Sequence, residues 1–167
     1  MKILNTFFVW LELAGLAFWV GGMMTLGALV APAVFGHVKP IESAGETMSL
    51  IFRNFNAGMV YVCIVLVAAG FLGKWFLSGP RSLRLRIEAV LVAVLVLSGL
   101  YIGAVLGPSM ETLRQTMLTD RSNGTAVAEF DRQHRQSVTL FSVNIFLGLA
   151  VLWMNARPSN GAGRKES

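Results

Sequence analysis

Four long runs of apolar residues dominate the chain, and short segments rich in polar residues, glycine and proline separate them. The first run, residues 7–35, contains a single charged residue, Glu12. As an α-helix its 29 residues would be roughly 43 Å long, whereas the hydrocarbon core of a bilayer is about 30 Å thick. We therefore predict a membrane-spanning helix that extends beyond the core.

The other runs predict three more spans, at about residues 57–77, 87–106 and 137–156. A short helix with Ser43 as its N-cap is expected before the second span, because Ser43 and Glu46 have the spacing of a capping box. Gly107-Pro108 is expected to end the third span. The fourth helix is expected to begin near Thr125, well before its span. We find no internal sequence repeat.

The predicted fold class is therefore an all-α integral membrane protein, a four-transmembrane-helix bundle whose helix ends extend on the outer side. Residues 1–157 form this domain, and the glycine- and serine-rich segment 158–167 is predicted to be a disordered cytoplasmic tail.

The composition supports this class, because 54% of the residues are hydrophobic and only 14% are charged, with a mean hydropathy of +0.63. Soluble domains carry about 25% charged residues. The net charge of +5 and the pI near 10 could indicate nucleic-acid binding. The basic residues, however, flank the apolar runs, where they favour lipid headgroups. The predicted partner is the lipid bilayer, not nucleic acid.

The orientation follows from the short link between the second and third spans, which carries Arg81, Arg84 and Arg86 and no acid. Cytoplasmic loops are enriched in lysine and arginine. Lys74 and Trp75 are expected to mark the same interface. We therefore predict a multi-pass protein of the cell inner membrane with both termini cytoplasmic.

Small residues recur in the first span at steps of three and four, which places them on one helix face. We predict that this face is a helix-packing seam, with a pore or hinge as the alternative. Pro32 is expected to bend the helix near Ala28, because proline cannot donate a backbone hydrogen bond. The predicted packing residues are Gly15, Gly21, Gly22 and Pro32; the full face comprises Ala14, Ala17, Gly21, Thr25, Ala28 and Pro32, with Gly15 and Gly22 beside it.

A polar stripe runs along one face of the fourth helix and comprises His134, Ser137, Asn144 and Asn155. Asn144 lies near mid-membrane, where it could contact a ligand or form an interhelical hydrogen bond. We also expect the outer helix ends to form a cap filled by Phe35, Phe52, Phe55 and Phe130, with His134 at its floor. The ligand-site candidates are His134, Ser137, Asn144 and His37.

Glu12 and Glu88 are the carboxylates expected inside the spans, one to two turns from the cytoplasmic end. With Arg84 and Arg86 at the same level, we predict cytoplasmic-edge ion pairs in which the carboxylates are partly solvated. The alternative is a proton or cation relay, a common role of ionisable residues inside membranes.

His37 and His134 are the only histidines, and both fall at outer helix ends. They are the candidate metal ligands, together with Glu129 or Asp131, although no local ligand motif supports a site. We also find no spacing typical of a catalytic array or of haem ligation. The sequence predicts no enzyme activity and no cofactor. The single cysteine, Cys63, lies in an apolar run and is expected to pack as a small hydrophobe.

Several short motifs, in order, resemble the transmembrane protein 205-like family, a four-span domain of unknown function. In the first span the run from Trp19 to Gly22 and the run from Val30 to Phe35 carry the resemblance. The later motifs are Ala44-Gly45 with Ile51-Phe52-Arg53, Pro108 with Leu113-Arg114, and Phe130 with His134, Ser137 and Asn144. Gln133 departs from the apolar residue that the family pattern has there. The resemblance implies a small polytopic membrane protein without an established activity.

These observations together predict a non-enzymatic binding, accessory or transport-related module, which acts as a homo-oligomer or with a membrane-protein partner. The alternative is a metal-handling protein, for copper or another heavy metal, that uses the outward-facing histidines.

The predicted orientation can be tested by labelling single cysteines in intact cells with a membrane-impermeant reagent. We expect Ser122→Cys to react from outside, and Ser82→Cys and Ser159→Cys to react only after the membrane is opened. External labelling of Ser82→Cys would reverse the predicted orientation.

Overall fold

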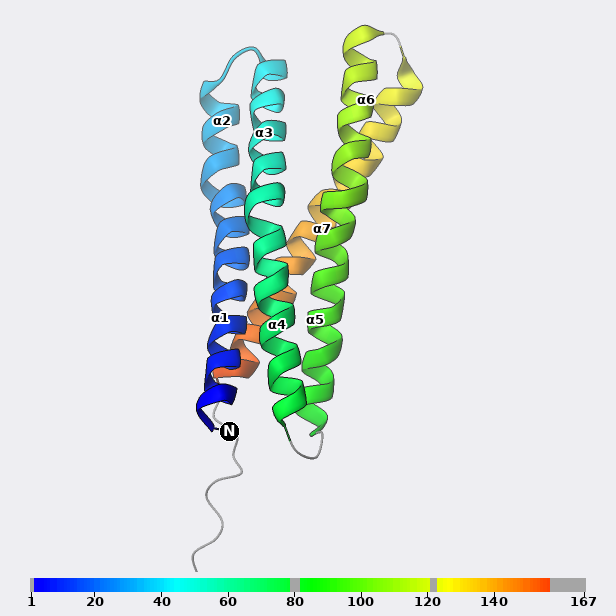
Figure 1. Cartoon of the computed structure of the whole chain (residues 1–167). Coiled ribbons are helices and arrows are strands. Elements are labelled where there is room, and N and C mark those ends of the chain that lie inside the picture. Colours follow the sequence, from blue (N-terminus) through cyan, green and yellow to red (C-terminus); the bar gives the residue numbers. More distant parts are fainter. Residues whose placement is uncertain (1, 79–81, 121–122, 157–167) are drawn as a thin grey trace, which may run out of the picture.

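The computed structural model describes residues 2–78, 82–120 and 123–156. Within these ranges every regular element is helical (Figure 1). Four continuous helices are long and apolar enough to cross a membrane, which confirms the predicted helix-bundle class. We refer to them as helices 1 to 4: Lys2–His37, Ile41–Leu77, Leu83–Thr119 and Gly124–Ala156. The tail predicted over 158–167 lies outside the described residues.

The first three helices each contain a five-residue π-helical segment between two α-helical parts. Helix 1 consists of α1 (Lys2–Thr25), η1 (Leu26–Val30) and α2 (Ala31–His37). Helix 2 consists of α3 (Ile41–Phe55), η2 (Asn56–Val60) and α4 (Tyr61–Leu77). Helix 3 consists of α5 (Leu83–Tyr101), η3 (Ile102–Leu106) and α6 (Gly107–Thr119), and helix 4 is α7 (Gly124–Ala156).

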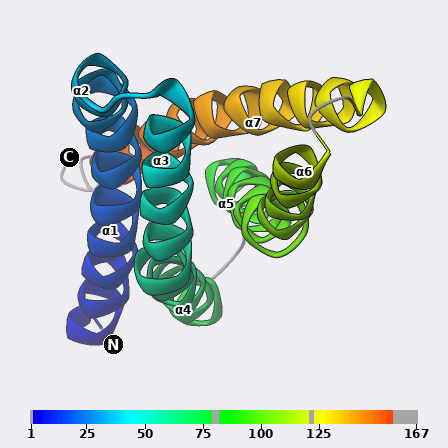
Figure 2. The ribbon, with the colours of Figure 1, turned by 90° about the horizontal axis from the view of Figure 1, so that it is seen from above.

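The helices form two antiparallel hairpins, hairpin 1 from helices 1 and 2 and hairpin 2 from helices 3 and 4 (Figures 1 and 2). The hairpins pack on one another through α1 against α7 and through α4 against α5. The N-terminal end of α1 and the C-terminal ends of α4 and α7 lie at one end of the bundle, which we call the inner end. The opposite, outer end carries the α2–α3 link, in which the Lys39–Pro40 peptide bond is cis.

Two predicted helix ends are wrong. Helix 3 does not stop at Gly107-Pro108 but continues to Thr119. Proline is tolerated there because it lies in the first turn of α6, directly after a π-helical segment that changes the hydrogen-bonding register. Helix 2 begins at Ile41 after Pro40, with no side-chain cap, so Ser43 is not its N-cap. The predicted short helix is the outer part of helix 2.

The predicted start of helix 4 near Thr125 agrees with its observed start at Gly124. The disturbance that Pro32 was expected to cause near Ala28 takes the form of the π-helical segment η1, which includes Ala28. The outer extensions of the helices are likewise present, because each helix has 33 to 37 residues.

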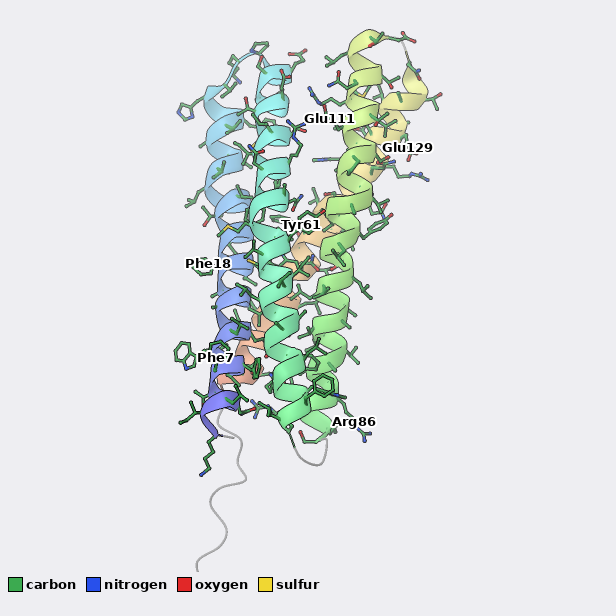
Figure 3. All side chains as sticks on the ribbon, in the orientation of Figure 1. Phe7, Phe18, Tyr61, Arg86, Glu111 and Glu129 are labelled. Carbon is green, nitrogen blue, oxygen red and sulfur yellow. The ribbon has the colours of Figure 1, made fainter. Side chains whose placement is uncertain are left out.

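The predicted packing seam on helix 1 is wrong for most of its residues. Ala17, Gly21, Thr25, Ala28 and Pro32 are all exposed on the side that faces away from the bundle. Large residues form the contact face instead, and Leu16, Trp19 and Met23 are almost completely buried. Figure 3 shows Phe7 and Phe18 pointing away from the other helices, as expected for side chains that contact lipid.

Glycine does permit close helix contacts at two of the predicted positions, Gly15 and Gly22, and at others on α4 and α7. A Cβ atom on Gly15 would lie 2.9 Å from Leu66 Cβ, and one on Gly70 would lie 2.5 Å from the backbone nitrogen of Glu12. One on Gly148 would lie 2.3 Å from the Val20 side chain. A Cβ on Gly21, in contrast, would meet nothing within 4 Å. Since α1 and α4 touch almost backbone to backbone, the inner half of hairpin 1 is rigidly packed.

We expect Gly15→Leu to destabilise the protein by about 1–3 kcal/mol, because the added side chain would push α4 away from α1. Gly21→Leu on the same helix is the matched control and should leave stability unchanged. Thermal unfolding in detergent measures both. If the two variants are equally stable, the close contact between α1 and α4 does not contribute to the stability of the fold as we infer.

Candidate functional site

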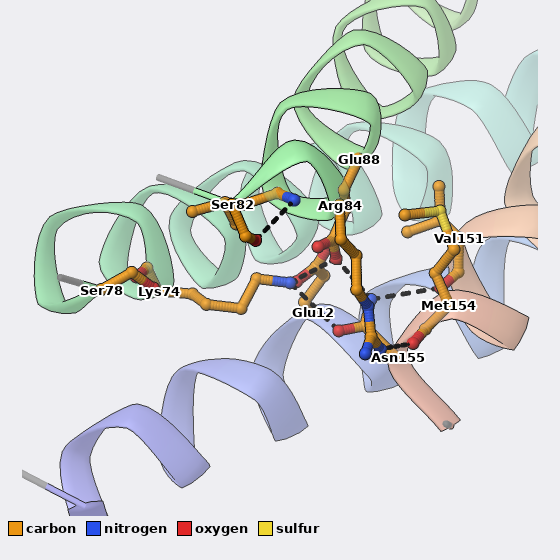
Figure 4. A network of polar contacts seen from close by, with 10 residues as sticks. Glu12, Lys74, Ser78, Ser82, Arg84, Glu88, Val151, Met154 and Asn155 are labelled. Atoms are coloured by element: carbon orange, nitrogen blue, oxygen red, sulfur yellow. Dashed lines mark hydrogen bonds and ion pairs between the residues drawn. The ribbon is translucent and has the colours of Figure 1, made fainter. Parts of the chain in front are cut away.

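Four polar side chains, one from each helix, meet at the inner end of the bundle (Figure 4). Glu12 comes from α1, Lys74 from α4, Glu88 from α5 and Asn155 from α7. We call them the inner cluster. The three charged residues are buried, with exposed fractions of 0% for Glu12, 7% for Lys74 and 4% for Glu88. Ionisable groups buried this deeply between membrane helices are rare and commonly functional.

The ammonium of Lys74 is the centre of the inner cluster. Its Nζ donates hydrogen bonds to Glu12 Oε2 at 2.7 Å, to Asn155 Oδ1 at 3.0 Å and to Glu88 Oε1. Asn155 in turn donates from Nδ2 to Glu88 Oε1 at 2.7 Å. The three hydrogens of the ammonium therefore have three acceptors, and the four helices are linked through a single nitrogen atom.

The carboxylates of the inner cluster have fewer hydrogen-bond partners than they could accept, in contrast to the lysine. Glu12 Oε1 is buried and has no hydrogen-bond partner among the described residues. Two carboxyl groups share one ammonium. When all three groups are ionised, Glu12, Lys74 and Glu88 together carry a net charge of −1. In a medium of low dielectric constant such an unpaired charge is costly.

The expected ion pairs at the cytoplasmic edge differ from those in the structure. The cation against Glu12 and Glu88 is Lys74, which was expected to extend to the headgroups. Arg84 is half-buried and donates to the carbonyl oxygen of Met154 at the end of α7, and Arg86 is exposed. The expectation that both carboxylates are partly solvated is wrong, because the ends of α4, α5 and α7 cover them.

One sequence signal could have identified Lys74. It is the only charged residue between Arg53 and Arg81, and it follows Val67 and Gly70 at the helical spacing of the buried face of α4. A lysine at the headgroup level would be expected on the lipid-facing side instead.

Asn144 forms a second polar contact, nearer the middle of the bundle. It is 1% exposed and accepts a hydrogen bond from Ser98 of α5, which is the interhelical bond expected as one alternative. It also lines a small cavity of about 10 Å³, enough for about one water molecule. The cavity is bordered by residues of all four helices: Trp19, Met23, Phe55, Asn56, Val60, Gly99, Ile102, Phe141 and Asn144.

The predicted cap over His134 is wrong. His134 is exposed and stacks on Phe130 of its own helix, with ring centroids 6.1 Å apart. Helix 4 crosses the bundle obliquely, so its outer part lies beside α6 and away from helices 1 and 2 (Figure 2). The polar stripe therefore faces the bundle only in its inner part, where Asn144 and Asn155 lie, while Ser137 is half-buried.

The aromatic residues expected in that cap are also separated. Phe35 is exposed, whereas Phe52 packs edge-to-face against Phe141 at a centroid distance of 5.8 Å. Phe55 lies against Gly22 and lines the central cavity.

The two histidines do not contribute to a metal-ligand group in the described parts of the chain, where no cluster of three or more His, Cys, Asp or Glu side chains occurs. His37 is exposed at the end of α2, and its Nδ1 lies 3.0 Å from the carbonyl oxygen of Ala33 in the same helix.

Polar contacts also join the hairpins at the outer end, where Glu111 of α6 faces α3 (Figure 3). Ser49 of α3 donates to Glu111 Oε2 at 3.3 Å. Arg114 pairs with Glu111 at 2.9 Å and approaches Glu46 of α3 at 3.8 Å. Since these side chains are partly exposed, each contact contributes little to stability.

Comparison with known proteins places the chain in a family. The model of a family described as "Domain of unknown function (DUF4149)" matches residues 14–119, more than half of the chain, so the chain belongs to that family. No curated protein matches, and no solved structure matches. The matched region includes Lys74 and Glu88 and ends before helix 4. The comparisons give no support to the transmembrane protein 205-like name.

We expect Lys74→Met to destabilise the protein by about 3–5 kcal/mol, because it leaves two buried carboxyl groups without their cation. Lys39→Met, at an exposed position of the α2–α3 link, is the control and should have no effect. Adding Glu12→Gln to Lys74→Met should restore part of the lost stability. Thermal unfolding of the purified protein measures all three, and an unchanged melting temperature for Lys74→Met would contradict this account of the inner cluster.

Proposed function

We propose that this member of the family is a non-enzymatic, transport-related or accessory membrane module whose inner cluster binds and releases a proton. The observation that carries the proposal is the buried Glu12 carboxyl group, one oxygen of which has no partner.

The charge balance of the inner cluster supports proton binding. With Lys74 protonated, one carboxyl group is paired and the other leaves a buried negative charge in excess. A proton bound by one of the two carboxyl groups removes this excess. Because both carboxyl groups contact the same ammonium, the proton belongs to the pair and not to one residue.

The position of the inner cluster supports a role in coupling. Its hydrogen bonds join the two hairpins at the inner end, since Lys74 of hairpin 1 contacts Glu88 and Asn155 of hairpin 2. Protonation of a carboxyl group weakens its attraction to Lys74. A change in protonation therefore alters the contact between the hairpins, as is required of a module that responds to pH or to a proton gradient.

We further propose that the protein lies in the cell inner membrane with both termini cytoplasmic, which puts the inner cluster near the cytoplasmic surface. The arginines of the link between helices 2 and 3 support this orientation. The wider relationship to the transmembrane protein 205-like family is part of the same proposal and rests on the sequence motifs. The metal-handling alternative gains no support from the exposed, separate positions of His37 and His134.

Proton binding can be measured by infrared difference spectroscopy of the protein in lipid as the pH is raised. We expect the C=O band of a protonated, buried carboxyl group to disappear with the release of about one proton per chain. Glu12→Gln, which keeps the size and the acceptor oxygen of the side chain, should lack this band.

Glu111→Gln, which changes a carboxyl group at the outer end, is the control and should keep the band. The proposal is wrong if wild type shows no protonated-carboxyl band at any pH at which it remains folded, or if Glu12→Gln retains the band.

A further inference from the structure

Helices 1 and 3 are related by a constant shift of 76 positions, a repeat that sequence inspection missed. Under this shift Glu12 falls on Glu88, Gly27-Ala28 on Gly103-Ala104 and Pro32 on Pro108. The π-helical segments η1 (Leu26–Val30) and η3 (Ile102–Leu106) coincide from end to end. One helix thus repeats the other in its buried acid, its π-helical segment and its proline.

Helices 2 and 4 correspond in their pattern of buried positions, with a shift of 81, although the residues differ and η2 has no π-helical counterpart in helix 4. The buried residues Cys63, Val67 and Gly70 of α4 fall on the buried residues Asn144, Gly148 and Val151 of α7. Lys74 falls on Asn155. The five additional positions of hairpin 2 lie toward its outer end, where helix 3 continues further beyond its proline than helix 1 does, and so outside the buried inner halves.

The contacts obey the same correspondence. Within hairpin 1, Lys74 donates to Glu12 at 2.7 Å, and within hairpin 2, Asn155 donates to Glu88 at 2.7 Å. Helix 1 packs on helix 4 and helix 2 on helix 3, a pattern that is unchanged when the hairpins are exchanged. The inner cluster therefore lies at the interface of two equivalent units, where several transporter folds built from repeats bind substrate or ions.

We propose that the chain is a duplicated helical hairpin, and that its inner cluster is a paired site in which Asn155 stands at the position of a second lysine. Because Asn155 is neutral where a second lysine would be charged, the site lacks one positive charge. We infer that its ligand is a proton, which supplies that charge. This part of the inference rests on the proposed function, whereas the pairing of the hairpins does not.

The chemistry of Asn155 accounts for this assignment. Its amide donates to Glu88 as an ammonium would, but it carries no charge, and its Oδ1 accepts a hydrogen bond from Lys74. The charged groups around Glu12 are Lys74 from α4, and Glu88 and Arg84 from α5. Arg84 also donates to the carbonyl oxygen of Met154 near the C-terminal end of α7.

The first test supplies the second ammonium. We expect Asn155→Lys to abolish the protonated-carboxyl band, because two lysines then balance two ionised carboxylates. Ala156→Lys adds the same charge at the neighbouring, exposed position of α7 and should keep the band. Retention of the full band in a folded Asn155→Lys variant would overturn the assignment of Asn155 while leaving proton binding intact.

The second test depends on stability alone and does not require proton binding. We expect Lys74→Asn to lower the melting temperature, and the exchanged pair Lys74→Asn with Asn155→Lys to recover most of the loss, because the ammonium then reaches both carboxylates from hairpin 2. If the exchanged pair is no more stable than Lys74→Asn alone, the two positions are not equivalent and the paired site is wrong. Absence of a carboxyl band in wild type would instead reject the proposed function.

Discussion

The contact on which the inner half of the bundle depends is that of the Lys74 ammonium with two carboxylates. Moving an ion out of water costs several kcal/mol even after the protein relaxes. The three charged side chains therefore remain buried only if both carboxylates lie within hydrogen-bonding distance of the ammonium. This requirement fixes the depth and rotation of α1, α4 and α5 relative to one another. Close glycine contacts such as Gly70 against Glu12 make that proximity sterically possible.

The overall architecture could be predicted from the sequence because the lipid environment leaves few choices. Four apolar runs of sufficient length must form helices, since each backbone group has to be satisfied within its own segment. The same reasoning could not show which face of a helix turns inward. In lipid a large apolar residue is equally acceptable on either side, so the small residues of helix 1, such as Gly21, were assigned to the wrong face.

The candidate site was predictable only in part for a related reason. Glu12, Glu88 and Asn155 were identified because polar residues in apolar helices must turn toward protein. Lys74 and His134 were misplaced. A lysine near a helix end can extend either to the headgroups or into the bundle, and periodicity alone does not distinguish the two. The oblique course of helix 4, which exposes His134, depends on packing against α5 and α6 and leaves no mark on the periodicity of the helix itself.

The π-helical segments allow the two halves of a helix to be adjusted separately. A π-helical segment contains more residues per turn than the α-helix around it, so beyond it the side chains are rotated about the axis by roughly 100° per inserted residue. In helices 1 and 3 this rotation occurs between the buried acid and the outer part of the helix. Insertion or loss of a single residue in η1 or η3 would therefore rotate the outer part of the helix about its axis. Glu12 and Glu88, on the inner side of these segments, would keep their orientation toward Lys74. The same bundle could in this way turn different side chains toward its neighbours at the outer end while the geometry of the inner cluster is preserved.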